Sequence, residues 1–395
     1  MKHNNNMKYN KFLKHLSFWF PLLTLTSISL LIMYHTKYIS NIYENNFIKQ
    51  IIWFSIGYGI LSLSKLLPIK SIFKYSKYLY LLGIISLILV LLIGNSINGS
   101  KAWLSIGPIS FQPSEIMKLF YTCYLTHLVC NTKTFNIFEE LSLLIKVFLL
   151  FLIPTVLIFL EPDTGGVIYL LIITITILLN STIRKRWFII IAIIIAILSY
   201  SFIYFYIYNK ELLINLIGTS FFYRVERILD FKKGLQIENA LTAIGNAPFI
   251  SFNLTKVGVY IPESATDFIF ALSSNVFGLL GPSTILLSYL ILDYYLISYC
   301  QKISKKEYRL FGYSFTSLLI ISELINIAMN LSLVPIIGIP LPFLSYGGSG
   351  TITLFMYLSL LFANTNDKDN SKNKNSSHKG KVHKKAHIPA GQHYK

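Results

Sequence analysis

RWFIIIAIIIAILSYSFIYFYIY, at residues 186–208, is an apolar run with no charged side chain after Arg186. A helix needs about 20 such residues to cross the hydrocarbon core of a bilayer. Comparable runs lie on both sides of it, and the whole chain is 54% apolar and only 13% charged. A soluble domain carries about 25% charged residues. The sequence therefore predicts an all-α polytopic membrane protein.

We expect about ten membrane spans, with a long extracytoplasmic loop, 209–266, between the seventh and the eighth. The membrane domain would then occupy 18–363, between an N-terminal segment, 1–17, and a C-terminal tail, 364–395. No small-residue cleavage site follows the first span, so we do not interpret that span as a signal peptide. The expected spans are 18–34, 47–64, 78–94, 113–129, 143–160, 165–180, 186–208, 268–297, 308–330 and 343–363.

Basic residues collect in the loops that a ten-span count places on the same side as the two ends of the chain. The positive-inside rule makes that side cytoplasmic, so both termini are predicted to be cytoplasmic. The basic residues concerned are Lys2, Lys8, Lys11, Lys14, Lys65, Lys70, Lys74, Lys77, Arg184, Lys185, Arg186, Lys302, Lys305, Lys306 and Arg309.

The net charge of +18 does not indicate nucleic-acid binding, because the tail from Asn364 to Lys395 supplies much of it. That tail is rich in Asn, Ser and Lys, a composition typical of disorder. It would contact anionic lipid headgroups or dock a specific partner. Three cysteines without paired spacing indicate neither a disulfide framework nor a metal site. The chain also has no phosphate loop or nucleotide fingerprint.

A short polar stretch, PESATDFIFA at 262–271, places Asp267 at the mouth of the eighth predicted span. Ionisable groups at membrane helices are costly to keep and are therefore candidates for function. Asp267 is equally suited to cap the following helix before Phe268. The residues alone leave both interpretations open.

The fourth predicted span begins with Pro113, Glu115 and Lys118. Glu115 would lie in the first turn, where the helix dipole favours an anion, and Lys118 would share its face three residues on. The two would form a structural ion pair or one wall of a substrate cavity, and these interpretations are compatible. In the turn EPDTGG, 161–166, we favour turn formation over a cation or sugar site.

The loop 209–266 is much longer than an ordinary connection and is therefore expected to be functional. Within it, Arg224 and Arg227 are suited to diphosphate recognition, because the planar guanidinium makes bidentate hydrogen bonds. Phe221, Phe222 and Tyr223 beside them indicate a piece that lies at the membrane interface.

Three prolines interrupt the apolar stretch before the glycine-rich SYGGSG, 345–350, so this region cannot form one continuous helix. Such backbone persists at membrane depth only where it is buried in protein or lines a cavity. The N–H groups around Ser345, Gly347 and Gly348 would form an anion-binding concavity, or the segment would be a purely structural re-entrant turn. Together these regions fit an amphiphilic anionic substrate, handled by a transferase or by a transporter.

Four stretches, in this order, resemble the SEDS family of bacterial cell-wall proteins, typified by RodA and FtsW. The resemblance covers spans three to ten, about two-thirds of the chain. The stretches are NGSKAWLSIGPISFQPSEIMKL (98–119), EPDTGG (161–166), PESATDFIFA (262–271) and NIAMNLSLVPIIGIPLPFLSYGGSG (326–350).

The resemblance implies a peptidoglycan glycosyltransferase that joins lipid II units into glycan strands and releases undecaprenyl diphosphate. Asp267 matches the family's essential loop aspartate, and Glu115 and Lys118 match its paired fourth-helix residues. An aspartate there would act as general base for the attacking sugar hydroxyl. Arg224, Arg227 and Lys118 would stabilise the diphosphate leaving group, alone or with a divalent cation, Mg²⁺ or Mn²⁺.

The implied partner is a class B penicillin-binding protein, a single-span transpeptidase. The alternative is a lipid II transporter, or a non-enzymatic scaffold of the cell-wall synthesis or division machinery. Pro340 resembles the elongation type, since the division type more often has threonine there.

The chain departs from the family pattern at several positions. Ala265, Asn275 and Val276 replace a histidine and an acidic pair. Ala102 replaces an arginine whose charge Lys101 would supply to the substrate.

Overall fold

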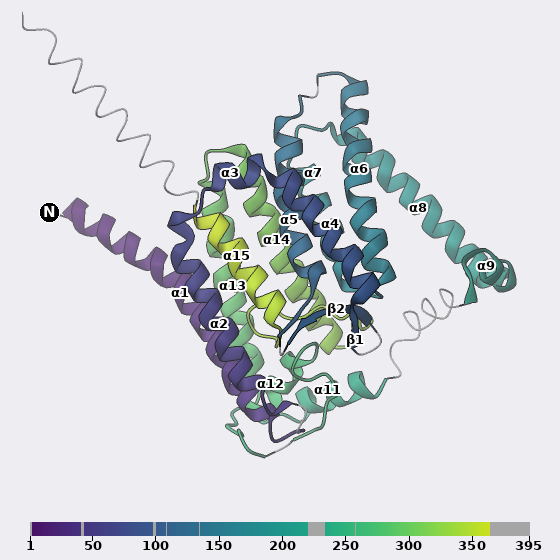
Figure 1. Ribbon diagram of the computed structural model, residues 1–395. Coiled ribbons are helices and arrows are strands. Elements are labelled where there is room, and N and C mark those ends of the chain that lie inside the picture. Colours follow the sequence, from purple (N-terminus) through teal and green to yellow (C-terminus); the bar gives the residue numbers. More distant parts are fainter. Residues whose placement is uncertain are drawn as a thin grey trace, which may run out of the picture.

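The computed structural model describes residues 2–40, 43–97, 100–107, 109–133, 135–219, 234–256 and 258–363. Helices occupy all ten predicted span positions, and Figure 1 shows most of them side by side in one bundle. They are α1 (Lys2–Thr36), α2 (Asn46–Ser62), α4 (Ser76–Ile93), α5 (Pro113–Asn131), α6 (Ile137–Leu160), α7 (Thr164–Leu179), α8 (Lys185–Tyr208), α13 (Leu280–Gln301), α14 (Lys306–Asn330) and α15 (Gly348–Ala363).

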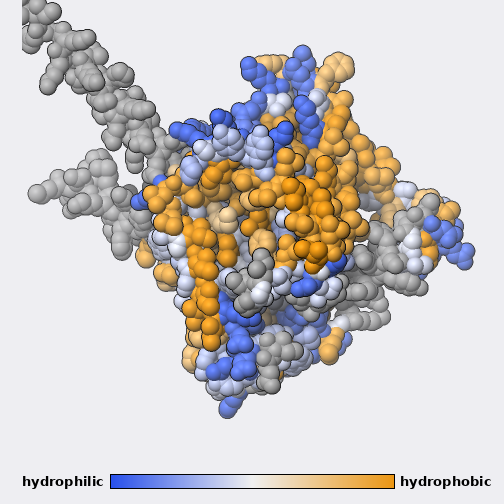
Figure 2. All heavy atoms as spheres, in the orientation of Figure 1, coloured by the Kyte–Doolittle hydropathy of each residue, from blue (hydrophilic) through white to orange (hydrophobic). Residues whose placement is uncertain are grey.

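Seven helices of the described ranges are long and apolar enough to cross a membrane, and α7 and α15 are shorter apolar helices. Figure 2 shows hydrophobic residues over the middle of one face and hydrophilic residues gathered at its two ends. This distribution is the one expected for a protein surrounded by lipid, so the prediction of an all-α polytopic membrane protein is confirmed.

The eighth predicted span, 268–297, is wrong as a single helix. The structure has a short helix α12 (Ile269–Phe277) and then α13, separated by Gly278 at φ +66°. A Cβ on Gly278 would lie 2.3 Å from the Pro248 carbonyl oxygen, so a larger residue does not fit at this break. The tenth predicted span also begins too early, because 341–347 is not helical and α15 begins at Gly348.

A small antiparallel sheet, which the sequence did not predict, fills the loop between α4 and α5. Its strands are β1 (Asn95–Ile97), β2 (Ser100–Ile106) and β3 (Ile109–Phe111), in the order β1-β2-β3. The remaining elements are η2 (Leu63–Leu66), α3 (Ile69–Lys74), α9 (Lys210–Ile217) and α11 (Leu235–Gly245).

The sheet, α11 and α12 lie at one end of the bundle and α3 lies at the other (Figure 1). The lysines around α3 are among those that predicted the cytoplasmic side. The sheet end is therefore the one that the sequence assigns to the outer face.

Two close helix pairs illustrate how the bundle is held. The α2 residue Gly57 packs directly on α15, because a Cβ there would lie 2.3 Å from the Phe355 ring. The rings of Phe315 and Tyr357 stack at 4.8 Å between α14 and α15. In contrast, α8 has no buried residue and extends away from the other helices (Figure 1).

Candidate functional site

Asp267 lies in the loop immediately before α12, outside the membrane-spanning helices. The turn that carries it is closed by the Thr266 and Phe268 N–H groups, which both donate to the Glu263 carbonyl oxygen at 3.2 Å. The N-cap of α12 is Phe268, and no side chain makes the capping hydrogen bond. The helix-cap interpretation of Asp267 is therefore wrong.

The Asp267 side chain is partly buried. Burial, together with the nearby Glu263 carboxylate, raises the pKa of Asp267 from 3.8 to about 7. A carboxylate with this pKa gains and loses its proton near neutral pH, which suits a general base.

The non-helical segment between α14 and α15, residues 331–347, faces this carboxylate and is called the re-entrant segment below. A Cβ placed on Gly338 would lie 3.8 Å from Asp267 Oδ2, and Gly338 has φ +75°, a conformation that favours glycine. From the other side, a Cβ on Gly165 would lie 3.0 Å from the Gly338 carbonyl oxygen. The Thr164 hydroxyl donates to the Ile337 carbonyl at 3.3 Å. The EPDTGG turn, the Asp267 loop and the proline-rich segment therefore meet at one place.

Asp163 is the N-cap of α7, as the preference for a turn predicted. Its Oδ1 accepts the Gly166 N–H at 2.8 Å, and its Oδ2 accepts from Gln112 Nε2 at 3.1 Å and Ser114 Oγ at 3.0 Å. These bonds attach the start of α5 to the EPDTGG turn. The neighbouring Glu161 side chain is buried, and burial beside Asp163 raises its pKa to about 8.

Glu115 and Lys118 form the predicted pair on one face of α5. Their charged atoms are 2.7 Å apart, and their side chains are 16% and 6% exposed. The Lys118 ammonium also lies 3.7 Å from the centre of the Tyr169 ring on α7. The two residues form the expected ion pair and also line a cavity, and substrate binding in that cavity stays a prediction.

The cavity beside this pair has a volume of about 50 Å³. Its walls come from α5, α7, α14, the re-entrant segment and the start of α15. The residues that line it include Glu115, Lys118, Tyr169, Ser322, Pro340, Pro342, Ser345, Tyr346, Gly347 and Gly350.

Ser345 connects this cavity to the Asp267 loop. Its hydroxyl donates to the Thr266 carbonyl at 2.6 Å and accepts the Leu341 N–H at 2.9 Å. The Tyr346 N–H donates to the Ala265 carbonyl at 2.9 Å. One segment thus forms a cavity wall and supports the backbone on which Asp267 sits.

The two glycines predicted to bind substrate lie in different surroundings. A Cβ on Gly348 would lie 2.6 Å from the Trp53 ring, so Gly348 allows close packing against α2. A Cβ on Gly347 would meet no atom within 4 Å, and Gly347 lines the cavity. An anion-binding role for Ser345, Gly347 and Gly348 stays a prediction.

Lys101 is engaged at the end of α4. It lies on strand β2, and its ammonium donates to the Leu91 and Leu92 carbonyls of α4, at 2.7 and 3.1 Å. Arg224 and Arg227 lie outside the described residues, as does the tail 364–395. The contacts of the two arginines with a diphosphate remain a prediction.

Asn326 and Asn330 were not predicted as site residues. Both side chains are fully buried in α14, and both amides donate to the Asp267 carbonyl oxygen, at 2.9 and 3.0 Å. The signal in the sequence is their spacing, NIAMN, which puts two amides on the same face of an apolar helix.

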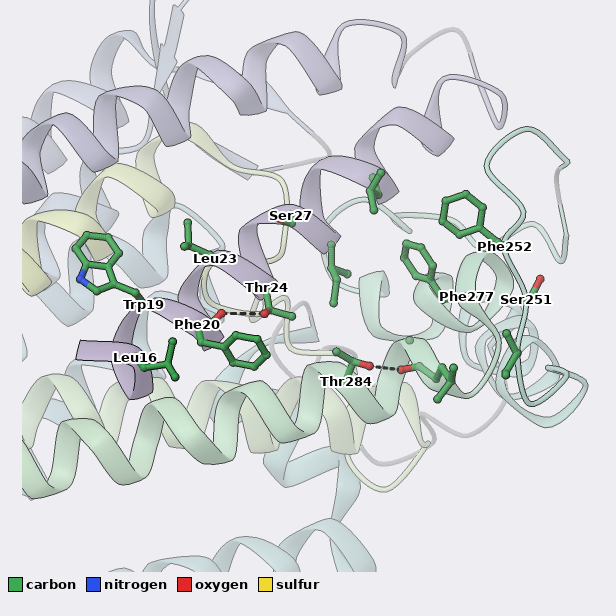
Figure 3. A pocket seen from close by; sticks show the side chains of 15 residues that line it. Leu16, Trp19, Phe20, Leu23, Thr24, Ser27, Ser251, Phe252, Phe277 and Thr284 are labelled. Carbon is green, nitrogen blue, oxygen red and sulfur yellow. Dashed lines mark hydrogen bonds between the residues drawn. The ribbon is translucent and has the colours of Figure 1, made fainter. Parts of the chain in front are cut away.

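A second, wider groove of about 720 Å³ lies between α1, residues 250–252 and the beginning of α13, and most of its lining side chains are apolar (Figure 3). Its threonine hydroxyls are satisfied within their own helices. Thr24 donates to the Phe20 carbonyl at 2.8 Å and Thr284 donates to the Leu280 carbonyl at 2.7 Å. The groove has no titratable lining residue, so the chemistry of the site lies around Asp267 and the Glu115 pair instead.

Within the described ranges, no group of three or more His, Cys, Asp or Glu side chains could hold a metal ion. Mg²⁺ is commonly bound by one or two carboxylates together with substrate phosphates. The expectation of a divalent cation therefore stays a prediction, and no step below depends on it.

Comparisons with known proteins agree with this architecture. Residues 14–370 match the family model for FtsW, RodA and SpoVE, described as cell cycle proteins. A probable peptidoglycan glycosyltransferase FtsW of Buchnera aphidicola subsp. Baizongia pistaciae is 31% identical over 318 residues, covering 77% of this chain and 80% of its own. Its counterpart in Hydrogenovibrio crunogenus is 30% identical over 321 residues, covering 76% and 77%.

Two solved structures share the fold. A chain from a study of a peptidoglycan synthase complex that coordinates polymerization and crosslinking superposes with a TM-score of 0.72 at 22% identity, covering 89% of this chain and 98% of that one. The rod shape determining protein RodA of Thermus thermophilus superposes with a TM-score of 0.60 at 22% identity, covering 88% and 96%. The match to the family model over residues 14–370, together with the shared fold, shows that the chain belongs to the FtsW/RodA/SpoVE family, the SEDS family of membrane proteins.

Proposed function

We propose that the protein is a peptidoglycan glycosyltransferase that polymerises lipid II and releases undecaprenyl diphosphate. The observation that carries this proposal is the environment of Asp267. Its carboxyl group is partly buried and faces Gly338, and burial beside Glu263 raises its pKa to about 7. The relatives named above as probable peptidoglycan glycosyltransferases support the reaction class.

The chemistry assigned to Asp267 is proton removal. The 4-hydroxyl of one GlcNAc attacks the anomeric carbon of the MurNAc of a second lipid II. The new carbon–oxygen bond forms as the bond to the diphosphate breaks, and the Asp267 carboxylate takes the hydroxyl proton. Polyprenyl diphosphate leaves with the bonding electron pair.

Positive charge must stabilise that leaving group. Lys118 is the first candidate within the described residues, because it lines the cavity beside the Asp267 loop. Its ammonium is paired with Glu115 at 2.7 Å, so that pair would have to open for Lys118 to bind the diphosphate. Arg224 and Arg227 are the further candidates in the loop. Lys101 is a weaker candidate, since its ammonium already binds two carbonyls of α4.

In the cell, we place this activity at the outer face of the bacterial cell membrane, with both termini cytoplasmic. A class B penicillin-binding protein would crosslink the new strand, and a related chain comes from a study of a peptidoglycan synthase complex. Pro340 favours a role in elongation and cell shape, whereas the relatives named above are called FtsW, which favours division. Identifying the penicillin-binding protein that co-purifies with the chain would separate these roles.

The test is polymerisation of labelled lipid II by the purified chain, alone and with its co-purifying penicillin-binding protein, beside an Asp267→Asn variant. Glycan ladders from the parent and none from the variant are expected. Absence of ladders from a folded parent complex would favour the transporter or scaffold alternative. Ladders from the variant would retain the polymerase and remove the role given to Asp267.

A further inference from the structure

Two buried side-chain amides of α14 bind the backbone around Asp267. Asn326 and Asn330 are four residues apart, so they lie on the same face of α14. Both are completely buried in a helix that is otherwise apolar enough to span a membrane. A buried amide is costly in such a helix unless it is hydrogen-bonded, so its partners indicate why it is there.

Asn326 connects two segments that are far apart in the sequence. Its Nδ2 donates to the Asp267 carbonyl oxygen at 2.9 Å and to the Ile339 carbonyl oxygen at 2.7 Å. One amide nitrogen therefore uses both hydrogens to hold the loop and the re-entrant segment together. Gly338, the neighbour of Ile339, is the residue that the Asp267 carboxylate faces.

Asn330 binds the same loop one helical turn further along. Its Nδ2 donates to the Asp267 carbonyl oxygen at 3.0 Å, and its Oδ1 accepts the Ala271 N–H at 3.1 Å. Ala271 lies in the first turn of α12, where backbone N–H groups have no partner within the helix. The Asn330 side chain thus fixes the backbone on both sides of Phe268.

We propose that Asn326 and Asn330 are positioning residues for Asp267, which fix its backbone against the re-entrant segment so that its carboxylate is held at the reacting sugar. This inference rests on the proposed function. The proposal does not require either amide to contact the substrate. Their effect is exerted through the position of Asp267, and a displacement of about 1 Å can cost on the order of 100-fold in rate.

The experiment uses the full chain with its co-purifying penicillin-binding protein and compares Asn326→Leu, Asn330→Leu and a matched control, Thr316→Val. Thr316 is also buried in α14, but its hydroxyl donates to the Gly312 carbonyl at 2.9 Å, away from the Asp267 loop. Melting temperature, kcat and KM for lipid II are measured from pH 5 to pH 9.

For each asparagine variant we expect kcat to fall on the order of 100-fold, with KM changed less than about threefold. We also expect the acidic limb of the pH–rate profile to move to lower pH, because a displaced loop exposes the Asp267 carboxyl to water. The control should keep the kcat and the pH profile of the parent. Its loss of melting temperature should be smaller, because the Gly312 carbonyl still accepts a backbone N–H within α14. An asparagine variant that behaves like the control would overturn the proposal.

Hydrogen exchange provides a readout that does not depend on activity. The Ala271 amide should exchange at least about tenfold faster in Asn330→Leu than in Thr316→Val, because its acceptor is gone. Unchanged exchange would overturn the assigned contact. If the parent is inactive, the proposed function fails while this exchange result still tests the positioning. If the parent is active and the asparagine variants have the kcat and pH profile of the control, the positioning inference fails and the proposed function stands.

Discussion

The Ser345 hydroxyl lies 2.6 Å from the carbonyl oxygen of Thr266, the residue before Asp267. The same hydroxyl accepts the Leu341 N–H at 2.9 Å, and Ser345 lines the cavity that holds Glu115 and Lys118. A single small side chain therefore connects the two parts of the site. A change that moves the cavity wall would also move the Asp267 loop.

Ser345→Ala should reduce polymerisation and stability together. The substitution leaves the Thr266 carbonyl and the Leu341 N–H without this partner, and each unsatisfied buried group costs about 1–3 kcal/mol. Thermal unfolding and glycan synthesis would be measured beside Ser359→Ala, which removes a buried serine of α15 that donates only to the Phe355 carbonyl. Equal activity in the two variants would contradict the connection.

The rate of polymerisation should rise with pH and level off above about pH 7. Asp267 acts as a base only when ionised, and burial beside Glu263 raises its pKa to about 7. Below that value the rate should fall about tenfold per pH unit, since the ionised fraction does. A profile that stays flat down to pH 5 would contradict the role of Asp267 as general base.

The same pKa predicts how Asp267 affects stability. The unfolded chain releases this proton near pH 3.8 and the folded chain near pH 7, so the folded state binds more protons between these values. Stability from this group is full below the lower pKa and is lost as the pH rises through the higher one. The free energy of unfolding of Asp267→Asn should therefore exceed that of the parent at pH 8 by on the order of 2 kcal/mol. The difference should be smaller at pH 5. The Glu161 carboxyl titrates in both proteins, so the comparison between them cancels its contribution.

Removing one charge of the Glu115–Lys118 pair should lower the free energy of unfolding by more than half of what removing both charges would cost. The side chains are 16% and 6% exposed, so Glu115→Gln or Lys118→Met alone leaves one buried charge without its partner. Such a loss typically costs about 3–5 kcal/mol, and removing both charges costs less than the two single losses together. Urea or thermal unfolding of the two single variants and the double variant would measure this coupling. Additive losses would mean that the two charges do not interact in the folded protein.

The sequence predicted the approximate positions of most of the long apolar helices, because length and hydropathy decide which segments enter lipid. It did not predict the break at Gly278, because nothing local distinguishes that glycine from one within a span. The close approach of the Pro248 carbonyl, which excludes a side chain, comes from a distant loop. The sheet at 95–111 was missed for a similar reason, since its strands β1 and β3 have only three residues each.

The site was predicted in part. Asp267, Glu115 and Lys118 are rare charged residues in apolar surroundings. Because burying a charge is costly, the sequence identified them as candidates. Asn326 and Asn330 carry no charge, and their importance depends on backbone carbonyls that only the folded chain brings to them. Lys101 was predicted from its charge, but its carbonyl partners on α4 depend on how strand β2 folds back.

Lys101→Met should therefore keep most of the polymerase activity and lose stability. Its ammonium satisfies two carbonyls at the end of α4, and a hydrogen bond from a charged donor contributes about 1.5–3 kcal/mol. The comparison variant is Lys118→Met, for which activity should be lost. If Lys101→Met is as inactive as Lys118→Met while melting like the parent, Lys101 acts on the substrate, as the resemblance implied.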